Sequence, residues 1–198
     1  TLGRTILGLE TATGGDVLFK GHSITGLSER RLRAIRQQIQ MIFQDPFSSL
    51  NPRMTVMDII TEGLAQHGLL QEPRDAAAAR LMGEVGLDRG SMYRYPHEFS
   101  GGQRQRISVA RALSLNPDFI VCDEAGSALD VSVQAQVINL LMDLRQRYSL
   151  SHLFISHDLS VVKFISQRVA VMYLGRIVET GPSRSVMEKP LHPYTQAL

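Results

Sequence analysis

Two patterns of apolar and polar positions occur along the chain, and each predicts one kind of secondary structure. Short apolar runs rich in β-forming residues predict strands at 39–43, 119–122 and 153–155. Apolar residues at helical spacing predict helices over 27–36, 100–115, 131–148 and 159–166. Strands that alternate with helices in this way are typical of an α/β layered fold.

The region 54–115 departs from this alternation because it contains no strand pattern. Its periodicity is helical, with one break at Gln71-Glu72-Pro73. We therefore expect a helical subdomain over 54–115, inserted into a nucleotide-binding core formed by 1–53 and 116–198. Together these parts form one domain, 1–198.

Shorter patterns predict the remaining elements. Residues 4–9 indicate the end of a helix, and 16–19 with 21–24 indicate short strands around a turn. Residues 169–173 and 177–179 flank Leu174-Gly175-Arg176, which predicts a hairpin.

Composition narrows the possible classes of protein. The chain has 198 residues, 43% hydrophobic and 20% charged, as is ordinary for one globular domain. A net charge of only +2 gives no reason to expect a nucleic-acid partner. The single cysteine excludes an internal disulfide, and no apolar run approaches the ~20 residues that cross a bilayer. A protein of this kind that works at a membrane would dock onto it.

Polar side chains follow each predicted strand of the sheet. Gln44 comes after the first strand, Asp123 and Glu124 after the second, and His157 after the third. In open α/β sheets, ligands bind beyond the carboxyl ends of the strands. Each residue taken alone has an ordinary structural explanation, but a common edge for all four predicts a shared site.

The residue types at this edge suit nucleotide chemistry. An apolar strand that delivers two adjacent carboxylates is how P-loop enzymes hold Mg²⁺, with Asp123 near the metal. Glu124 can polarise an attacking water as a general base. His157 can hydrogen-bond a terminal phosphate, and the amide of Gln44 can contact the metal or its water.

A second motif, Ser100-Gly101-Gly102-Gln103, opens the predicted helix over 100–115. A serine N-cap followed by two glycines exposes backbone N–H groups at a helix start, which favours an anion. An ordinary capped helix with a glycine turn is the alternative interpretation.

The order of these motifs resembles the ABC ATPase family over nearly the whole chain. The resemblance implies a P-loop NTPase (RecA-like) core, with ATP and Mg²⁺ as cofactors. It makes Ser100 to Gln103 the family signature, Gln44 the Q-loop glutamine and Asp123 the Walker B aspartate. It also implies that Glu124 is the catalytic glutamate, that Asp130 ends the D-loop Ser127-Ala128-Leu129-Asp130, and that His157 is the switch histidine.

Further segments resemble one branch of this family, the bacterial importers for dipeptides, oligopeptides, glutathione and nickel. They are 43–53, Tyr95-Pro96-His97-Glu98-Phe99 and 190–195. That resemblance implies transmembrane permease subunits, a second ATP-binding subunit, identical or homologous, and, indirectly, a periplasmic or extracellular substrate-binding protein. It implies a peripheral location on the cytoplasmic face of the bacterial inner membrane.

The family's phosphate loop, Gly-x-x-x-x-Gly-Lys-[Ser/Thr], does not occur in these residues. By resemblance, Thr1 stands one place beyond the loop's Mg²⁺-ligating hydroxyl and belongs to the ATP site. We therefore expect an N-terminally truncated chain, without its first strands, that neither binds ATP tightly nor hydrolyses it. Two alternatives stay open: a soluble, non-transport ABC-type ATPase, and a non-enzymatic interaction subunit.

Overall fold

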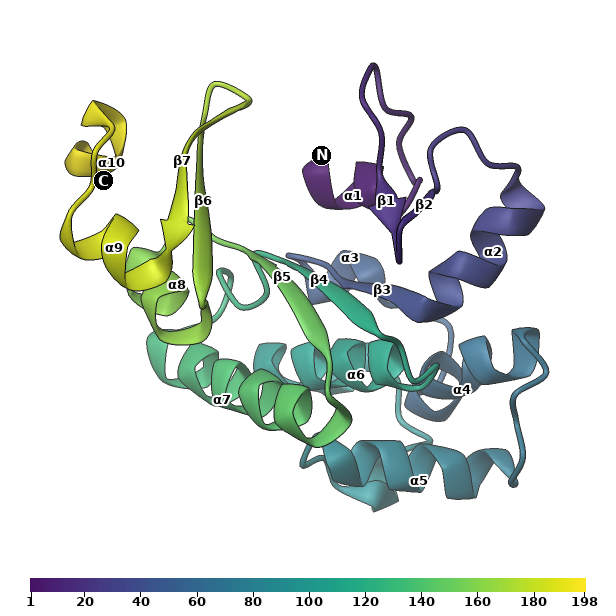
Figure 1. Cartoon of the computed structure of the whole chain (residues 1–198). Coiled ribbons are helices and arrows are strands. Elements are labelled where there is room, and N and C mark those ends of the chain that lie inside the picture. Colours follow the sequence, from purple (N-terminus) through teal and green to yellow (C-terminus); the bar gives the residue numbers. More distant parts are fainter. The chain divides into compact units, whose positions relative to one another are not determined.

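The computed structural model describes residues 1–198 as two compact units, Thr1–Ile155 and Ser156–Leu198. Figure 1 labels their helices and strands. The first unit has one hydrophobic core on each side of a sheet, and the second has a small core of its own.

The first unit contains most of the elements. Its helices are α1 (Leu2–Ile6), α2 (Glu29–Gln38), α3 (Pro46–Ser49), α4 (Val56–Gln66), α5 (Arg74–Glu84), α6 (Gly101–Leu113) and α7 (Val131–Tyr148). Its strands are β1 (Leu18–Phe19), β2 (His22–Ser23), β3 (Ile39–Ile42), β4 (Phe119–Asp123) and β5 (Ser151–Ile155). Two short 3-10 turns, Arg89–Ser91 and Pro96–Glu98, lie between α5 and α6.

A parallel sheet of order β3-β4-β5 organises this unit. The register pairs Ile42 with Cys122 and Cys122 with Phe154. Because the three strands run in the same direction, their carboxyl ends share one edge of the sheet. This edge is where the sequence places Gln44 and the Asp123-Glu124 pair.

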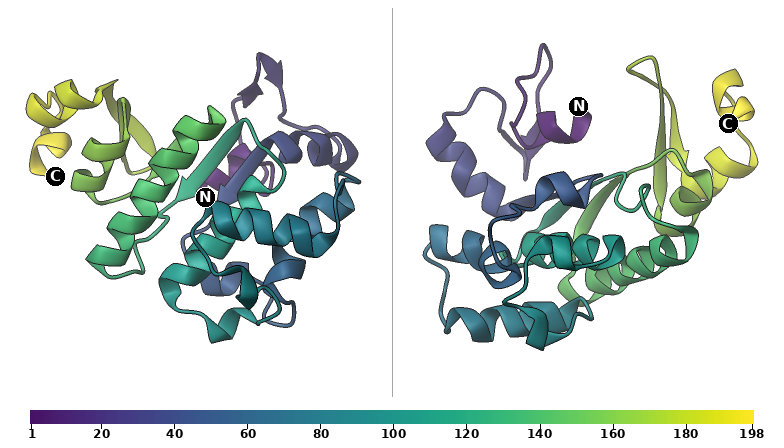
Figure 2. Two further views of the ribbon diagram at one scale, coloured as in Figure 1. Left: turned by 90° about the horizontal axis from the view of Figure 1, so that it is seen from below. Right: turned by 180° about the vertical axis from the view of Figure 1, so that it is seen from behind.

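Both faces of the sheet are covered, which explains the uninterrupted apolar run of β4. Ile120 and Cys122 point into the core formed with α4, α5, α6 and α7. Val121 points to the opposite side, where it packs with Leu7 and Ile24. Figure 2 shows α6 and α7 along one face of the sheet and α1 on the other.

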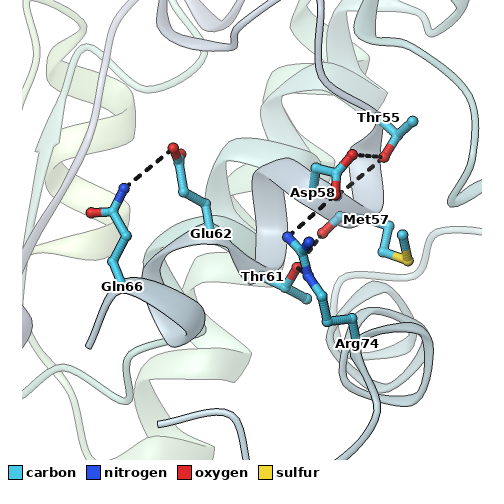
Figure 3. Close-up of polar contacts among 7 residues, drawn as sticks. All are labelled: Thr55, Met57, Asp58, Thr61, Glu62, Gln66 and Arg74. Atoms are coloured by element: carbon cyan, nitrogen blue, oxygen red, sulfur yellow. Dashed lines mark hydrogen bonds and ion pairs between the residues drawn. The ribbon is translucent and has the colours of Figure 1, made fainter. Parts of the chain in front are cut away.

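A polar network that contains one buried residue, Thr61, joins α4 to α5 (Figure 3). Thr55 caps α4 by accepting a hydrogen bond from the Asp58 N–H. The Arg74 guanidinium at the start of α5 forms an ion pair with Asp58 at 3.2 Å and donates to the Thr61 hydroxyl at 3.1 Å. That hydroxyl, in a fully buried residue, in turn donates to the Met57 carbonyl. The polar groups buried between the two helices are thereby satisfied.

The second unit contains α8 (Leu159–Ile165), β6 (Arg168–Tyr173), β7 (Arg176–Pro182), α9 (Ser183–Glu188) and α10 (Pro193–Ala197). Strands β6 and β7 form an antiparallel hairpin. Leu174 and Gly175 both have positive φ at its two-residue turn, as a type I′ turn requires. The carboxylate of Glu179 accepts hydrogen bonds from the N–H groups of Leu191 and His192, which ties the last segment to β7.

The structure confirms the predicted α/β alternation, the strands of the sheet, the main helices, the short strands around a turn within 16–24 and the hairpin within 169–179. It adds α3, α9 and α10, which the periodicity did not predict because a helix of four to six residues completes no amphipathic repeat. Residues 54–115 contain helices and no strand, while their status as an inserted subdomain stays a prediction. No helix combines the length and the apolar character needed to cross a membrane.

His152, the second residue of β5, is half-buried, and both of its ring nitrogens are buried. It pairs with Ile120, and neither of its ring nitrogens has a hydrogen-bond partner. Burial, and to a smaller extent the positive charge of Arg145, lower the pKa of His152 from 6.5 to about 4. The fold therefore holds this imidazole neutral while the unfolded chain protonates it near neutral pH.

We predict that the free energy of unfolding falls as the pH drops from about 6.5 towards about 4. Over that range the unfolded chain binds a proton that the folded chain does not, so the loss at about pH 5 is about 2 kcal/mol. Urea unfolding of the parent and of His152→Leu, at about pH 6.5 and at about pH 4, measures this change in the free energy of unfolding. The variant should lose less stability, whereas a control variant, His22→Gln, should follow the parent. An identical pH dependence in His152→Leu and the parent would contradict this.

Candidate ATP site

Two of the predicted site residues meet at the carboxyl edge of the sheet. Gln44 lies two residues beyond β3, and Glu124 lies one residue beyond β4. The Gln44 amide Nε2 donates a hydrogen bond to the Glu124 carboxylate Oε2 at 2.7 Å. Residues 80 positions apart in the sequence are therefore in direct contact, because their strands are parallel neighbours.

The backbone at Glu124 is unusual. Its φ of +48° lies in the left-handed region, which non-glycine residues rarely adopt. Two hydrogen bonds hold it there: its N–H donates to the Ile155 carbonyl and its carbonyl accepts from the Ser127 N–H. Such backbone strain gathers at functional sites. Here it turns the chain sharply at the end of β4, at the residue whose carboxylate meets Gln44.

Asp123 is the last residue of β4, where it pairs with Ile155 of β5. Asp123 is half-buried, and so is Glu124, the next residue in the sequence. The two adjacent carboxylates therefore occupy a strand end and the turn that follows it, as the sequence analysis expects. Their roles in binding a metal and activating water stay predictions.

The signature residues form a capping box at the start of α6. The Ser100 hydroxyl accepts from the Gln103 N–H at 3.3 Å, and the Gln103 Oε1 accepts from the Ser100 N–H at 2.9 Å. The ordinary capped helix that the sequence left open is thus present. Contacts of Ser100 and Gln103 with a phosphate stay a prediction.

The packing of α6 against its neighbours gives a separate structural reason for glycine at positions 101 and 102. A Cβ on Gly102 would lie 2.3 Å from Cγ1 of Val133 in α7, and one on Gly101 would lie 3.1 Å from Cδ2 of Leu129. The first distance is impossible for a real Cβ, so α6 and α7 approach each other closely only with glycine at 102. The sequence alone gives no sign of this role, which depends on a side chain of the neighbouring helix α7.

Asp130 caps α7 and uses its carboxylate within the chain. Its Oδ1 accepts from the Val133 N–H at 3.0 Å and from the Ser132 hydroxyl at 2.8 Å. These hydrogen bonds, first the one from Val133, lower the pKa of Asp130 below its usual value. The capping of α7 alone explains why an aspartate stands at position 130. The part of Asp130 in ATP binding stays a prediction.

Thr1 and His157 are the two remaining residues of the predicted site. Thr1 precedes α1, and its carbonyl accepts hydrogen bonds from the Thr5 N–H and hydroxyl. His157 lies two residues beyond the end of β5 and belongs to the second compact unit. Their roles at a phosphate stay predictions.

The donors at the strand ends fit Mg²⁺ by their chemistry. Asp123 offers a carboxylate and Gln44 an amide oxygen, and no group of three or more His, Cys, Asp or Glu forms a protein-only metal cage. Magnesium in nucleotide sites is bound through one or two carboxylates together with water and phosphate oxygens. The residues present are therefore compatible with a metal that arrives with a nucleotide.

Comparison with protein families identifies the class. The family model described as ABC transporter matches residues 1–127, about two thirds of the chain, and the chain therefore belongs to this family.

Individual relatives place it more narrowly. The chain is 57% identical over 200 residues to the "Glutathione import ATP-binding protein GsiA" of Shigella boydii serotype 4 (strain Sb227) and to that of Escherichia coli (strain K12). It is 54% identical over 200 residues to the "Oligopeptide transport ATP-binding protein AppF" of Bacillus subtilis (strain 168). Each alignment covers 100% of the chain, but 32% of GsiA and 61% of AppF. These relatives confirm the resemblance to the glutathione and oligopeptide branch.

A solved structure confirms the fold. The ATP-binding cassette MJ0796, described as a dimer in a post-hydrolysis state bound to ADP and Pi, superposes with a TM-score of 0.80 at 25% identity. The match covers 92% of this chain and 79% of that one. The α/β fold of an ABC ATPase, predicted from the order of the motifs, is therefore confirmed.

We predict that Gly102→Ala destabilises the chain by about 1–2 kcal/mol. Overpacking against the stiff Val133 side chain costs about 1–3 kcal/mol, and the higher helix propensity of alanine offsets up to about 1 kcal/mol of it. Chemical unfolding of Gly102→Ala alone and on a Val133→Ala background tests the cause. The substitution should cost much less on that background. Equal costs in both backgrounds would show that the contact does not impose glycine.

Proposed function

We propose that this chain is part of the ATP-hydrolysing subunit that energises a bacterial importer of small peptides, of the glutathione or oligopeptide type. The observation that carries the proposal is the hydrogen bond from Gln44 to Glu124 at the edge where parallel strands end. The names of GsiA and AppF, the relatives that match over the whole chain, support the class of cargo.

Each residue of the edge has a distinct part in the proposed reaction. The Glu124 carboxylate takes a proton from the water that attacks the terminal phosphate. Gln44 holds that carboxylate through Nε2, which leaves its Oε1 available to a metal. Asp123 would bind Mg²⁺, which when bound neutralises charge on the phosphates. His157 would hydrogen-bond the terminal phosphate.

The signature acts on a second subunit in this proposal. The start of α6 faces the phosphates that a partner ATP-binding subunit holds, and the residues that face them are Ser100, Gly101, Gly102 and Gln103. Asp130 and Thr1 belong instead to the ATP site of their own subunit. The MJ0796 cassette, which is dimeric with ADP and Pi, supports such a pair. The capping box supports it too, since it fixes the first turn of α6 before any ligand binds.

The further partners follow from the proposed class of transporter. Transmembrane permease subunits would anchor the ATPase at the cytoplasmic face of the membrane, and a substrate-binding protein would deliver the peptide. No nucleic acid enters this proposal. Co-purification of the tagged ATPase with two membrane subunits, and peptide-stimulated ATPase activity in the assembled complex, test it directly.

We predict that the 198-residue chain alone binds ATP weakly, with no saturation at micromolar ATP. These residues contain no Gly-x-x-x-x-Gly-Lys-[Ser/Thr] sequence, whose backbone N–H groups and lysine supply the main phosphate contacts. Isothermal titration calorimetry with Mg-ATP measures the affinity. The same residues joined behind a strand and a Gly-x-x-x-x-Gly-Lys-[Ser/Thr] loop serve as the positive control. Micromolar binding by the chain alone would refute this.

We predict that Glu124→Gln, in an ATPase that carries a phosphate loop, keeps ATP binding and loses turnover by about 10²–10⁴-fold. The glutamine keeps the size of the side chain but cannot accept a proton from water. Steady-state kcat and equilibrium ATP binding separate the two effects. Glu188→Gln, at an exposed position in α9, is the matched control and should behave like the parent. Turnover close to normal in Glu124→Gln would remove this residue from the base role.

A further inference from the structure

Gln105 is a fully buried amide that the proposed site does not use. Its side chain has an exposed fraction of 0%, and neither its Nε2 nor its Oε1 has a hydrogen-bond partner. An amide offers two donors and two acceptor lone pairs, so an apolar residue of similar shape would suit a purely structural position better. A buried polar group of this kind calls for a physical explanation.

Its place on α6 connects Gln105 with two other segments. It lies four residues after Gly101 and three before Ser108, so these three residues share one face of the helix. At Gly101 this face meets Leu129, in the loop that follows the Asp123-Glu124 pair. At Ser108 the hydroxyl lies 3.4 Å from that of Ser49 in α3.

The two segments that meet this face both leave the candidate site. Segment 45–50 follows Gln44 and includes α3, and segment 125–130 follows Glu124. Further contacts hold the first segment to α6: the Arg104 guanidinium lies 5.2 Å from the ring centre of Phe47, and Arg111 donates to the Ser49 carbonyl. Gln105 therefore lies on α6 between the anchor points of both segments.

We propose that Gln105 is a positioning residue, whose amide links segments 45–50 and 125–130 to α6 through an internal water molecule. Buried waters typically make about three hydrogen bonds to buried polar groups that lack other partners, and a water-mediated bond is nearly as favourable as a direct one. The link keeps Gln44 and Glu124 at their bonding distance when the loops around them move. The amide serves this placement, and the stability of the fold does not require it.

Amide hydrogen exchange in the 198-residue chain tests the link without any ATPase activity. The informative amides are those of Ser49, Ser127 and Leu129, which donate to Asp45, Glu124 and Gly126 within the two segments. In Gln105→Met, which has nearly the same shape but no amide, these protons should exchange about fivefold to tenfold faster. The melting temperature should stay the same or rise.

Ile107→Val is the matched control, because Ile107 is equally buried in α6 but points to another face. It should lower the melting temperature without selective exchange in either segment. Unchanged exchange of all three amides in Gln105→Met would overturn the proposal. So would a loss of folding in both Gln105→Met and Gln105→Leu, since the amide would then be required for stability.

A second measurement rests on the proposed function. In an ATPase with a phosphate loop, Gln105→Met should lower kcat several-fold and leave KM for ATP unchanged. An unchanged kcat would overturn the positioning role even if the exchange rates rise. A parent protein without ATPase activity would refute the proposed function, while the exchange experiment would still decide the placement of the two segments.

Discussion

The hydrogen bond between Gln44 and Glu124 depends on the parallel pairing of β3 with β4, and the proposed site is centred on that bond. The pairing brings two distant polar side chains to one edge of the sheet. Glu124, in a left-handed conformation just beyond β4, accepts the hydrogen bond from Gln44. Segments 45–50 and 125–130, which follow these two residues, pack on α6. They connect the edge of the sheet to the signature helix.

The signature motif has a structural use alongside its proposed role in phosphate binding. Ser100 and Gln103 satisfy each other's backbone N–H groups, and Gly102 permits the close approach of α6 to α7. These contacts organise the start of α6 within a single chain. A preformed helix start needs little further ordering when an anion binds, which reduces the entropic cost of that step.

The sequence predicted much of this arrangement because its signals are local. Apolar runs bounded by polar residues identified β3, β4 and β5, and strand ends identified Gln44 and Glu124 as neighbours. The close contact of Gly102 with Val133 and the buried amide of Gln105 were not predictable, since both depend on side chains from elements distant in the sequence. The four-residue helix α3 carries a local signal that was overlooked: Asp45 accepts from the N–H groups of Phe47 and Ser48, and proline follows it at the first helical position.

The central claim is that the residues at this edge grip the terminal phosphate of a nucleotide. A crystal structure of these residues joined behind a phosphate loop, with Mg²⁺ and a non-hydrolysable ATP analogue, tests it most directly. The account predicts Asp123 and Gln44 at the metal, with Glu124 and His157 within hydrogen-bonding distance of the γ-phosphate or its attacking water. A nucleotide bound elsewhere, or Glu124 turned away from the γ-phosphate, would contradict it.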